Sequence, residues 1–272
     1  MFILSSGSTY HVKVVGEGSP IVLLHGFTGS LITWNQTTDI LKHHFQCVLI
    51  DIIGHGASDC PDDVARYQID KVAYDIIHIL DTLEIPKAHI AGYSMGGRVA
   101  IATAILYPSR VASLILESSS PGLKTDEERA ARRKSDKQIA DRIEQEGIKK
   151  FIDYWENIPL FSSQKALPKK KQLEIRKQRL ENNPLGLANS LKGMGTGVQP
   201  SYWDRLDEIK LPTLLLCGEL DQKFCKLAEE MGLSIQKAKV EKVVQAGHAI
   251  HVEQPHFFGK IIIEFVSDHF SI

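Results

Sequence analysis

The pentapeptide Gly92–Gly96, of the form G-x-S-x-G, constrains the fold of this 272-residue chain more than any other segment. The apolar run Ala88–Gly92 precedes its serine, and the segment Met95–Leu106, whose apolar residues recur with helical periodicity, follows it. This order predicts a strand, a sharp turn and a helix. A serine on such a turn, here Ser94, is held in a strained backbone with its hydroxyl group exposed. The pentapeptide therefore indicates a nucleophile elbow at the end of a strand.

Strands and helices are predicted to alternate along most of the chain. Several of the predicted strands are continuously apolar, which is expected where helices cover both faces of a sheet. The predicted strands are 9–15, 21–25, 46–51, 88–92, 111–117, 213–218 and 239–244. The predicted helices are 31–43, 69–83, 95–106, 223–231 and 255–269. This alternation predicts an α/β fold with a doubly wound, mostly parallel sheet.

Residues 121–200 differ from the rest in pattern and in charge. They contain no convincing strand and four predicted helices, at 125–145, 148–157, 168–182 and 185–191. They also carry 17 lysines and arginines against 11 aspartates and glutamates, in a chain that has 32 and 33 overall. We therefore expect a basic helical cap at 121–200, inserted into an acidic core made of residues 1–120 and 201–272.

Composition excludes several classes of protein. The chain is 43% hydrophobic and 24% charged, and its net charge of -1 favours neither nucleic acid nor a membrane as partner. Its apolar runs are too short to span a bilayer, and its first residues lack the basic and apolar regions of a signal peptide. The four cysteines do not have zinc-ligand spacing and are expected to be reduced thiols. We expect a cytoplasmic protein without a metal; the sequence does not define an oligomeric partner.

A serine hydroxyl needs a neighbouring base, and a histidine serves when a carboxylate fixes its tautomer. Asp221 follows the predicted strand 213–218, and His248 follows the last predicted strand. Both positions lie at carboxyl ends of strands, as Ser94 does, and the order Ser, Asp, His fits this arrangement. We therefore predict Ser94, Asp221 and His248 as a catalytic triad. Glu219 is the alternative carboxylate, and the alternative bases are His251 and His256.

An oxyanion hole requires two backbone N–H donors beside the serine. One is expected from Met95, which follows Ser94 at the start of a helix. The other is expected from Phe27, in the glycine-containing loop 25–29 that follows a predicted strand. No phosphate-binding loop or dinucleotide fingerprint is present.

These features together resemble the α/β-hydrolase superfamily, over about 190 residues outside the predicted cap. A closer resemblance extends nearly end to end, to the menaquinone-pathway family of 2-succinyl-6-hydroxy-2,4-cyclohexadiene-1-carboxylate synthases. It is carried by the segments 92–100, 117–123 and 128–136, by Trp155 with Pro159, and by Arg179, Asn182 and Asn183. The chain departs from many relatives in having Ile53 where they have proline, and in the basic stretch 165–171.

The resemblance implies a lyase that eliminates pyruvate from a cyclohexene carrying three carboxylates, with the triad serine as general base and no metal or organic cofactor. It implies substrate-binding roles for Arg132 and Arg179, and cavity-lining roles for Tyr93 and Trp155. Arg98 lies one helical turn after Ser94, on the same helix face, so its guanidinium group is expected to reach a ligand at the serine. Guanidinium groups suit carboxylates because they bind them through two hydrogen bonds. The expected partner is therefore a small anionic polycarboxylate.

Two alternatives remain open at this point. The same triad would serve a serine hydrolase acting on esters, or on carbon–carbon bonds of ring-cleavage products. A ligand-binding protein that had lost catalysis is the second alternative, and the intact set of serine, aspartate and histidine argues against it.

Overall fold

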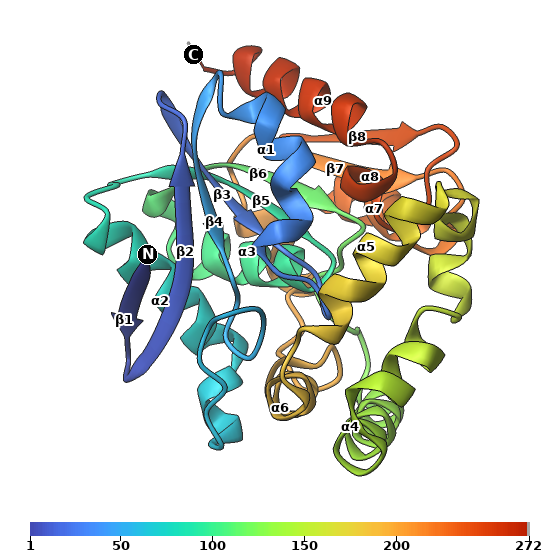
Figure 1. Cartoon of the computed structure of the whole chain (residues 1–272). Helices are drawn as coiled ribbons and strands as arrows, with labels where there is room; N and C mark the ends of the chain where they lie inside the picture. Colours follow the sequence, from blue (N-terminus) through green and yellow to red (C-terminus); the bar gives the residue numbers. More distant parts are fainter. Residues whose placement is uncertain (271–272) are drawn as a thin grey trace.

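An eight-stranded sheet runs through the centre of the computed structural model, which describes residues 1–270 (Figure 1). The order across the sheet is β1-β2-β4-β3-β5-β6-β7-β8. β1 and β2 pair antiparallel, as do β2 and β4, and all other neighbours pair parallel. The strands are β1 Phe2–Ser5, β2 Ser8–Val15, β3 Ser19–Leu24, β4 Phe45–Ile50, β5 Ala88–Tyr93, β6 Val111–Glu117, β7 Thr213–Gly218 and β8 Ala238–Val243. The mostly parallel sheet predicted from the sequence is confirmed.

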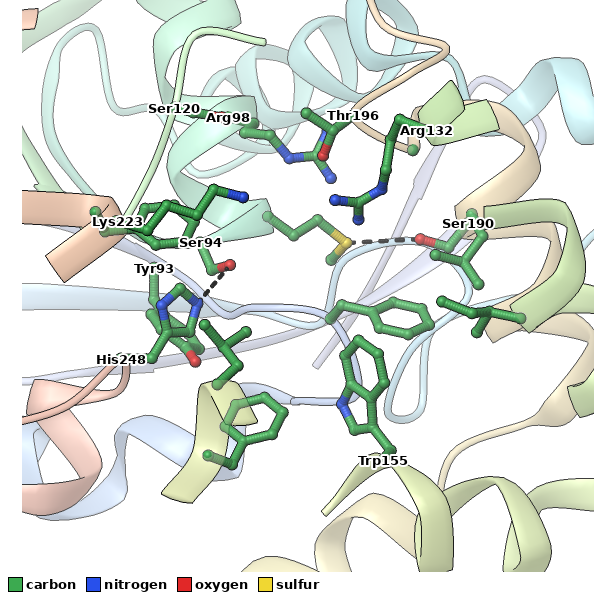
Figure 2. A pocket seen from close by; sticks show the side chains of 18 residues that line it. Tyr93, Ser94, Arg98, Ser120, Arg132, Trp155, Ser190, Thr196, Lys223 and His248 are labelled. Atoms are coloured by element: carbon green, nitrogen blue, oxygen red, sulfur yellow. Dashed lines mark hydrogen bonds between the residues drawn. The ribbon is translucent and has the colours of Figure 1, made fainter. Parts of the chain in front are cut away.

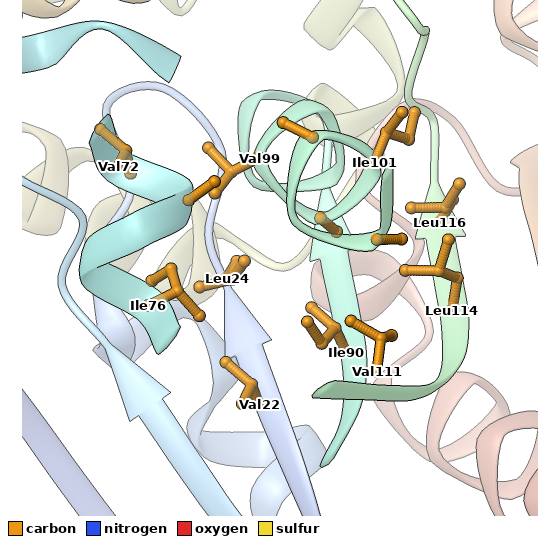
Figure 3. Close-up of a cluster of buried hydrophobic side chains, with 14 of the residues drawn as sticks. Val22, Leu24, Val72, Ile76, Ile90, Val99, Ile101, Val111, Leu114 and Leu116 are labelled. Carbon is orange, nitrogen blue, oxygen red and sulfur yellow. The ribbon is translucent and has the colours of Figure 1, made fainter. Parts of the chain in front are cut away.

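Helices cover both faces of this sheet. Side chains alternate between the faces along each strand, so neighbouring residues enter different cores. In β3, Val22 and Leu24 pack toward α2 (Ile69–Thr82) and α3 (Met95–Leu106), as Figure 3 shows. Ile21 and Leu23 of the same strand pack toward the other face, which is covered by α1 Asn35–Leu41, α8 Ile250–Glu253 and α9 Pro255–Ser267. Burial on both faces explains why the central strands are continuously apolar.

The segment between β6 and β7 is helical, and it lies beside the end of the sheet where β3 and β5 finish (Figure 1). Up to residue 200 its elements are α4 Asp126–Trp155, a 3₁₀ helix Pro159–Ala166, α5 Lys169–Leu180 and α6 Pro184–Met194. α4 is interrupted at Gly147, where φ is 80°, near the expected boundary between two helices. The segment has an apolar cluster of its own, made by Ala140, Ile143, Phe151, Ile152, Leu187, Ala188 and Leu191. We propose that 121–200 is a cap and that 1–120 with 201–272 is the core, of which residues 271–272 lie outside the described part.

The structure adds or changes a few elements. The strand β1 was not predicted, and the expected helix 31–43 consists of a 3₁₀ helix Leu31–Trp34 followed by α1. Further 3₁₀ helices occur at Val64–Tyr67, Pro108–Arg110 and Trp203–Glu208, and the remaining α-helix is α7 Gln222–Ser234. None of the helices in residues 1–270 combines the length and the apolar character that crossing a bilayer requires.

Candidate active site

Ser94 lies on a strained turn between β5 and α3. Its backbone has φ 50° and ψ -105°, a conformation that a residue with a side chain rarely adopts. A hydrogen bond to β6 fixes the turn, because the Ser94 N–H donates to the Glu117 carbonyl at 2.9 Å. Gly96 allows α3 to approach β3, since a Cβ there would overlap the Leu24 carbonyl. The backbone around Ser94 is therefore fixed by β3, β5 and β6 together.

The structure brings the three residues predicted as a triad within hydrogen-bonding distance. His248 Nε2 lies 3.1 Å from Ser94 Oγ, and His248 Nδ1 lies 2.6 Å from Asp221 Oδ2. Asp221 is itself fixed as the N-cap of α7, where its other oxygen accepts the Phe224 N–H at 3.4 Å. With Nδ1–H donated to the carboxylate, Nε2 is free to accept the serine proton. The imidazole is 2% exposed, and its ring lies among those of Tyr93 and Phe224.

The alternative residues occupy other positions. Glu219 accepts the Gln245 N–H at 3.0 Å, which ties the end of β7 to the loop after β8. His256 is exposed on α9. His251 is buried, but its Nδ1 lies 2.7 Å from a carboxylate oxygen of Glu117, and it does not contact Ser94 by a hydrogen bond in the described residues. None of the three replaces Asp221 or His248 in the arrangement around Ser94.

The two N–H groups predicted for the oxyanion hole belong to residues that line the cavity of Ser94. Met95 begins α3, and Phe27 lies in the loop after β3. This loop is held by His25, whose Nε2 accepts the Ile52 N–H at 2.9 Å and whose Nδ1 lies 2.8 Å from the Gly26 carbonyl. Both bonds form only with the neutral ring protonated at Nδ1, and burial lowers the pKa of His25 accordingly.

The cavity at Ser94 combines aromatic walls with basic groups, and Figure 2 shows the side chains that line it. Phe27 and Trp155 form an edge-to-face pair with centroids 5.4 Å apart. The guanidinium groups of Arg98 and Arg132 lie together on the side that Thr196 also lines. The lining comprises Phe27, Tyr93, Ser94, Met95, Arg98, Ser120, Arg132, Ile139, Trp155, Leu160, Phe161, Ser190, Leu191, Gly195, Thr196, Lys223, Phe224 and His248.

Arg98 reaches this cavity from α3 and is 9% exposed. Its Nη1 donates to the Met194 carbonyl at 2.6 Å and to the Gln199 side chain, so two neutral acceptors orient the guanidinium group. The pKa of Arg98 is lowered to about 10, mainly by burial and also by the positive charge of Arg132, while the negative charge of Asp136 opposes both effects. An incoming carboxylate would supply negative charge that the neutral acceptors do not.

Arg132 lies on α4 and forms an ion pair with Asp136, one helical turn away, with Nε 2.7 Å from Oδ1. The other carboxylate oxygen of Asp136 is buried and has no hydrogen-bond partner within residues 1–270. Burial raises the pKa of Asp136, while the adjacent arginines lower it. This pair holds the Arg132 side chain at the cavity wall and leaves part of its guanidinium group available to a ligand.

Arg179 does not line the cavity of Ser94. Its guanidinium group lies 4.4 Å from the centroid of the Phe161 ring and donates to Gln164 at 3.1 Å, in cavities next to that of Ser94. Phe161 lines both sides, so its ring separates Arg179 from the serine. Arg179 is 8% exposed, and burial lowers its pKa. Its role in binding substrate stays a prediction.

Sequence reasoning missed several lining residues, of which Lys223 is the most basic. Lys223 lies in the first turn of α7, two residues after Asp221, and Figure 2 places it close to Ser94. Its position in the first turn of the helix that the predicted acid Asp221 precedes was the signal that could have identified it. Leu160 and Phe161 come from the 3₁₀ helix Pro159–Ala166, where the sequence has no clear periodicity.

Comparisons with known proteins agree with this fold. The family model for the α/β-hydrolase fold matches residues 19–255. A Bacillus subtilis (strain 168) protein named putative 2-succinyl-6-hydroxy-2,4-cyclohexadiene-1-carboxylate synthase is 46% identical over 266 residues, which is 97% of each chain. The synthase of that name from Citrobacter koseri is 34% identical and covers 88% of this chain and 90% of its own.

A solved structure described as MenH from S. aureus superposes with a TM-score of 0.91 at 36% identity, covering 95% of this chain and 98% of that one. The similarity therefore includes the helical segment 121–200 as well as the sheet. The chain belongs to the α/β-hydrolase fold family and, within it, to the family of 2-succinyl-6-hydroxy-2,4-cyclohexadiene-1-carboxylate synthases.

Proposed function

We propose that this protein is a lyase of menaquinone biosynthesis that eliminates pyruvate from 2-succinyl-5-enolpyruvyl-6-hydroxy-3-cyclohexene-1-carboxylate. The observation that carries the proposal is the placement of a proton-accepting pair, Ser94 and His248, in one cavity with the guanidinium groups of Arg98 and Arg132. Carbon-acid chemistry on a polyanion needs both features side by side. The names of the relatives in the family support the choice of substrate.

The reaction consists of one deprotonation and one elimination. Removal of the ring proton next to the succinyl ketone leaves an electron pair that forms a new double bond to the adjacent ring carbon. The existing ring double bond shifts by one position, and the bond between the ring and the enolpyruvyl oxygen breaks. The products are the 2,4-cyclohexadiene and the enolate of pyruvate, which takes up one proton on carbon and becomes pyruvate. Atoms and charge balance without an oxidant or reductant.

The residues of the triad supply the base. Ser94 Oγ takes the ring proton as its own proton passes to His248 Nε2, and Asp221 stabilises the imidazolium ion that forms. Negative charge develops on the succinyl ketone oxygen, and the N–H groups of Phe27 and Met95 are the donors proposed for it. The start of α3 adds the positive end of a helix dipole at the same point. No covalent bond between Ser94 and the substrate is needed.

The three carboxylates of the substrate account for the basic groups of the cavity. We assign Arg98 and Arg132 to two of them, because a guanidinium group binds a carboxylate through two parallel hydrogen bonds. Arg179 is assigned to the third, with Phe161 displaced, and Tyr93 and Trp155 form the walls around the ring. The proposed partner is thus a small anionic polycarboxylate. A cytoplasmic location is part of the same proposal, because such a charged intermediate does not cross a bilayer unaided.

Pyruvate release from the pathway substrate tests this function directly. We expect purified protein, without added metal or cofactor, to release pyruvate and form the conjugated diene in equal amounts, at a rate far above that in buffer. Lactate dehydrogenase with NADH measures the pyruvate, and absorbance measures the diene. A rate equal to the uncatalysed elimination would refute the proposal. Hydrolysis of simple esters with no pyruvate release would favour the serine-hydrolase alternative.

A further inference from the structure

A half-buried carboxylate outside the triad, that of Glu253, joins the loop that carries His248 to the helical segment 121–200. Glu253 ends the short helix α8, and one of its oxygens accepts the Gly247 N–H at 2.7 Å. The other oxygen accepts the Ser163 hydroxyl at 2.9 Å. Gly247 directly precedes His248, whereas Ser163 belongs to the 3₁₀ helix Pro159–Ala166, 90 residues away from Glu253 in the chain. Glu253 therefore connects two parts of the active site.

The contact between these two parts is close as well as polar. A Cβ at position 247 would overlap the Ser163 side chain, so only glycine fits beneath this hydroxyl. Ser163 thus packs directly on the backbone that leads into His248. A shift of the 3₁₀ helix would therefore displace Gly247, and with it the imidazole of the next residue, His248.

The same 3₁₀ helix shapes the substrate cavity. Leu160 and Phe161 line the cavity, and the Phe161 ring lies 6.2 Å from the ring of His248. Phe161 also separates Arg179 from Ser94, as described above. Any ligand that moves Phe161 acts on the helix to which Ser163 belongs.

The surroundings of Glu253 fit a positioning role. Both bonds use its oxygens as acceptors, as a carboxylate provides. The pKa of Glu253 is raised, mainly by burial and also by the nearby negative charge of Glu117. The hydrogen bonds from Gly247 and Ser163 act in the opposite direction, because they stabilise the carboxylate. A charge-assisted bond to a backbone N–H is among the stronger hydrogen bonds in proteins, so the carboxylate holds Gly247 firmly.

We propose that Glu253 is a positioning residue for His248, and that Ser163 extends its hold to the 3₁₀ helix that forms one wall of the cavity. One carboxylate then holds both the backbone before His248 and the 3₁₀ helix of the cavity wall. Binding of substrate against that wall and alignment of the His248 imidazole are therefore linked. The part that concerns substrate binding rests on the proposed pyruvate elimination. The part that concerns His248 does not depend on which reaction the triad performs.

Four variants separate these two parts. Glu253→Ala is expected to lower kcat by about tenfold or more, since a displacement of about 1 Å in a catalytic group costs up to 10²-fold. Glu253→Gln keeps an acceptor for Gly247 and a polar group for Ser163, and should recover kcat to within about threefold of wild type. Ser163→Ala loses only the link to the wall, and should raise KM by about three- to tenfold with kcat little changed. Ser162→Ala, an exposed neighbour on the same helix, is the matched control and should change neither constant.

A second readout makes the outcome independent of the substrate. The rate at which a serine-directed fluorophosphonate labels Ser94 depends on His248, and should fall with Glu253→Ala but not with Ser163→Ala. If wild-type protein were labelled but released no pyruvate, the proposed function would fail while the labelling rates still decided the role of Glu253. Glu264→Ala, at an exposed site on α9, controls for the loss of a negative charge.

Circular dichroism and thermal unfolding identify variants that do not fold. Folded Glu253→Ala protein with wild-type kcat and wild-type labelling would overturn the proposal. Should Glu253→Ala not fold, the other two variants decide it: Glu253→Gln with a labelling rate lowered tenfold, or Ser163→Ala with an unchanged KM, would overturn it.

Discussion

Replacing Ser94 by alanine is expected to lower kcat for pyruvate release by about 10²- to 10⁴-fold, the usual contribution of a positioned general base. The physical reason is the geometry at the elbow, where Ser94 Oγ lies 3.1 Å from His248 Nε2 and opens into the cavity. Without the hydroxyl group, the imidazole has to take the carbon-bound proton from further away. The measurement is steady-state pyruvate release by wild type and variant at the same substrate concentrations.

Binding of the product diene separates loss of the base from loss of the site. Arg98 and Arg132 are unchanged in Ser94→Ala, so its Kd for the product should stay within about threefold of the wild-type value. A variant that binds product normally and still turns over at more than a tenth of the wild-type rate would show that Ser94 is not the base. In that case His248 would be the first candidate to act directly.

Replacing Arg98 by alanine is the second large effect. We expect kcat/KM to fall by an amount that corresponds to about 2–5 kcal/mol, or about 30- to 5,000-fold, because a buried carboxylate of the substrate would lose its partner. Arg98→Lys keeps the charge but not the planar fork, and should lie between alanine and wild type. A loss below tenfold for Arg98→Ala would show that Arg98 is peripheral to binding.

The structure also supplies the control for this variant. Arg98 donates to the Met194 carbonyl and to Gln199, so its removal leaves acceptors unpaired and costs stability as well. Arg110 likewise donates to backbone carbonyls, those of Pro86 and Ile85, at the opposite end of β6 from the site. Arg110→Ala should also lower the free energy of unfolding, and it should leave kcat/KM unchanged.

The sequence was sufficient to predict those elements in which the apolar periodicity and the flanking turn residues indicate the same boundaries. β6, α3 and β7 begin and end where apolar pattern and turn residues predict. The placement of Ser94, Asp221 and His248 after three different strands predicted their proximity, because parallel strands bring their carboxyl ends to one edge of the sheet. Local pattern and global topology give the same answer at these positions.

Other elements have no such signal. β1 is four residues long and lies at the sheet edge, where its alternate residues Phe2 and Leu4 are exposed and Ile3 is buried. A short amphipathic edge strand resembles an irregular terminus in sequence. The 3₁₀ helix Pro159–Ala166 has no 3.6-residue period, so neither it nor the place of Phe161 in front of Arg179 could be predicted.

Contacts between residues far apart in the sequence could not be predicted either. Glu117 and His251 are 134 residues apart, and Glu253 and Ser163 are 90 residues apart. A single sequence contains no pattern that pairs such residues, because each is a common polar residue whose local context does not identify its partner. The helices of 121–200 were predicted, whereas the contact that joins them to His248 required the structure.

The central claim is that the Ser94–His248 pair removes a proton from carbon, and an isotope effect on pyruvate release tests it most directly. The substrate is prepared with deuterium at the ring carbon next to the succinyl ketone, and kcat/KM is compared with that of unlabelled substrate. We predict that deuterium slows wild-type protein severalfold, and that it slows Ser94→Cys at least as much. Equal rates for both substrates in wild type and variant, together with a covalent adduct on Ser94 detected by mass spectrometry, would contradict the account.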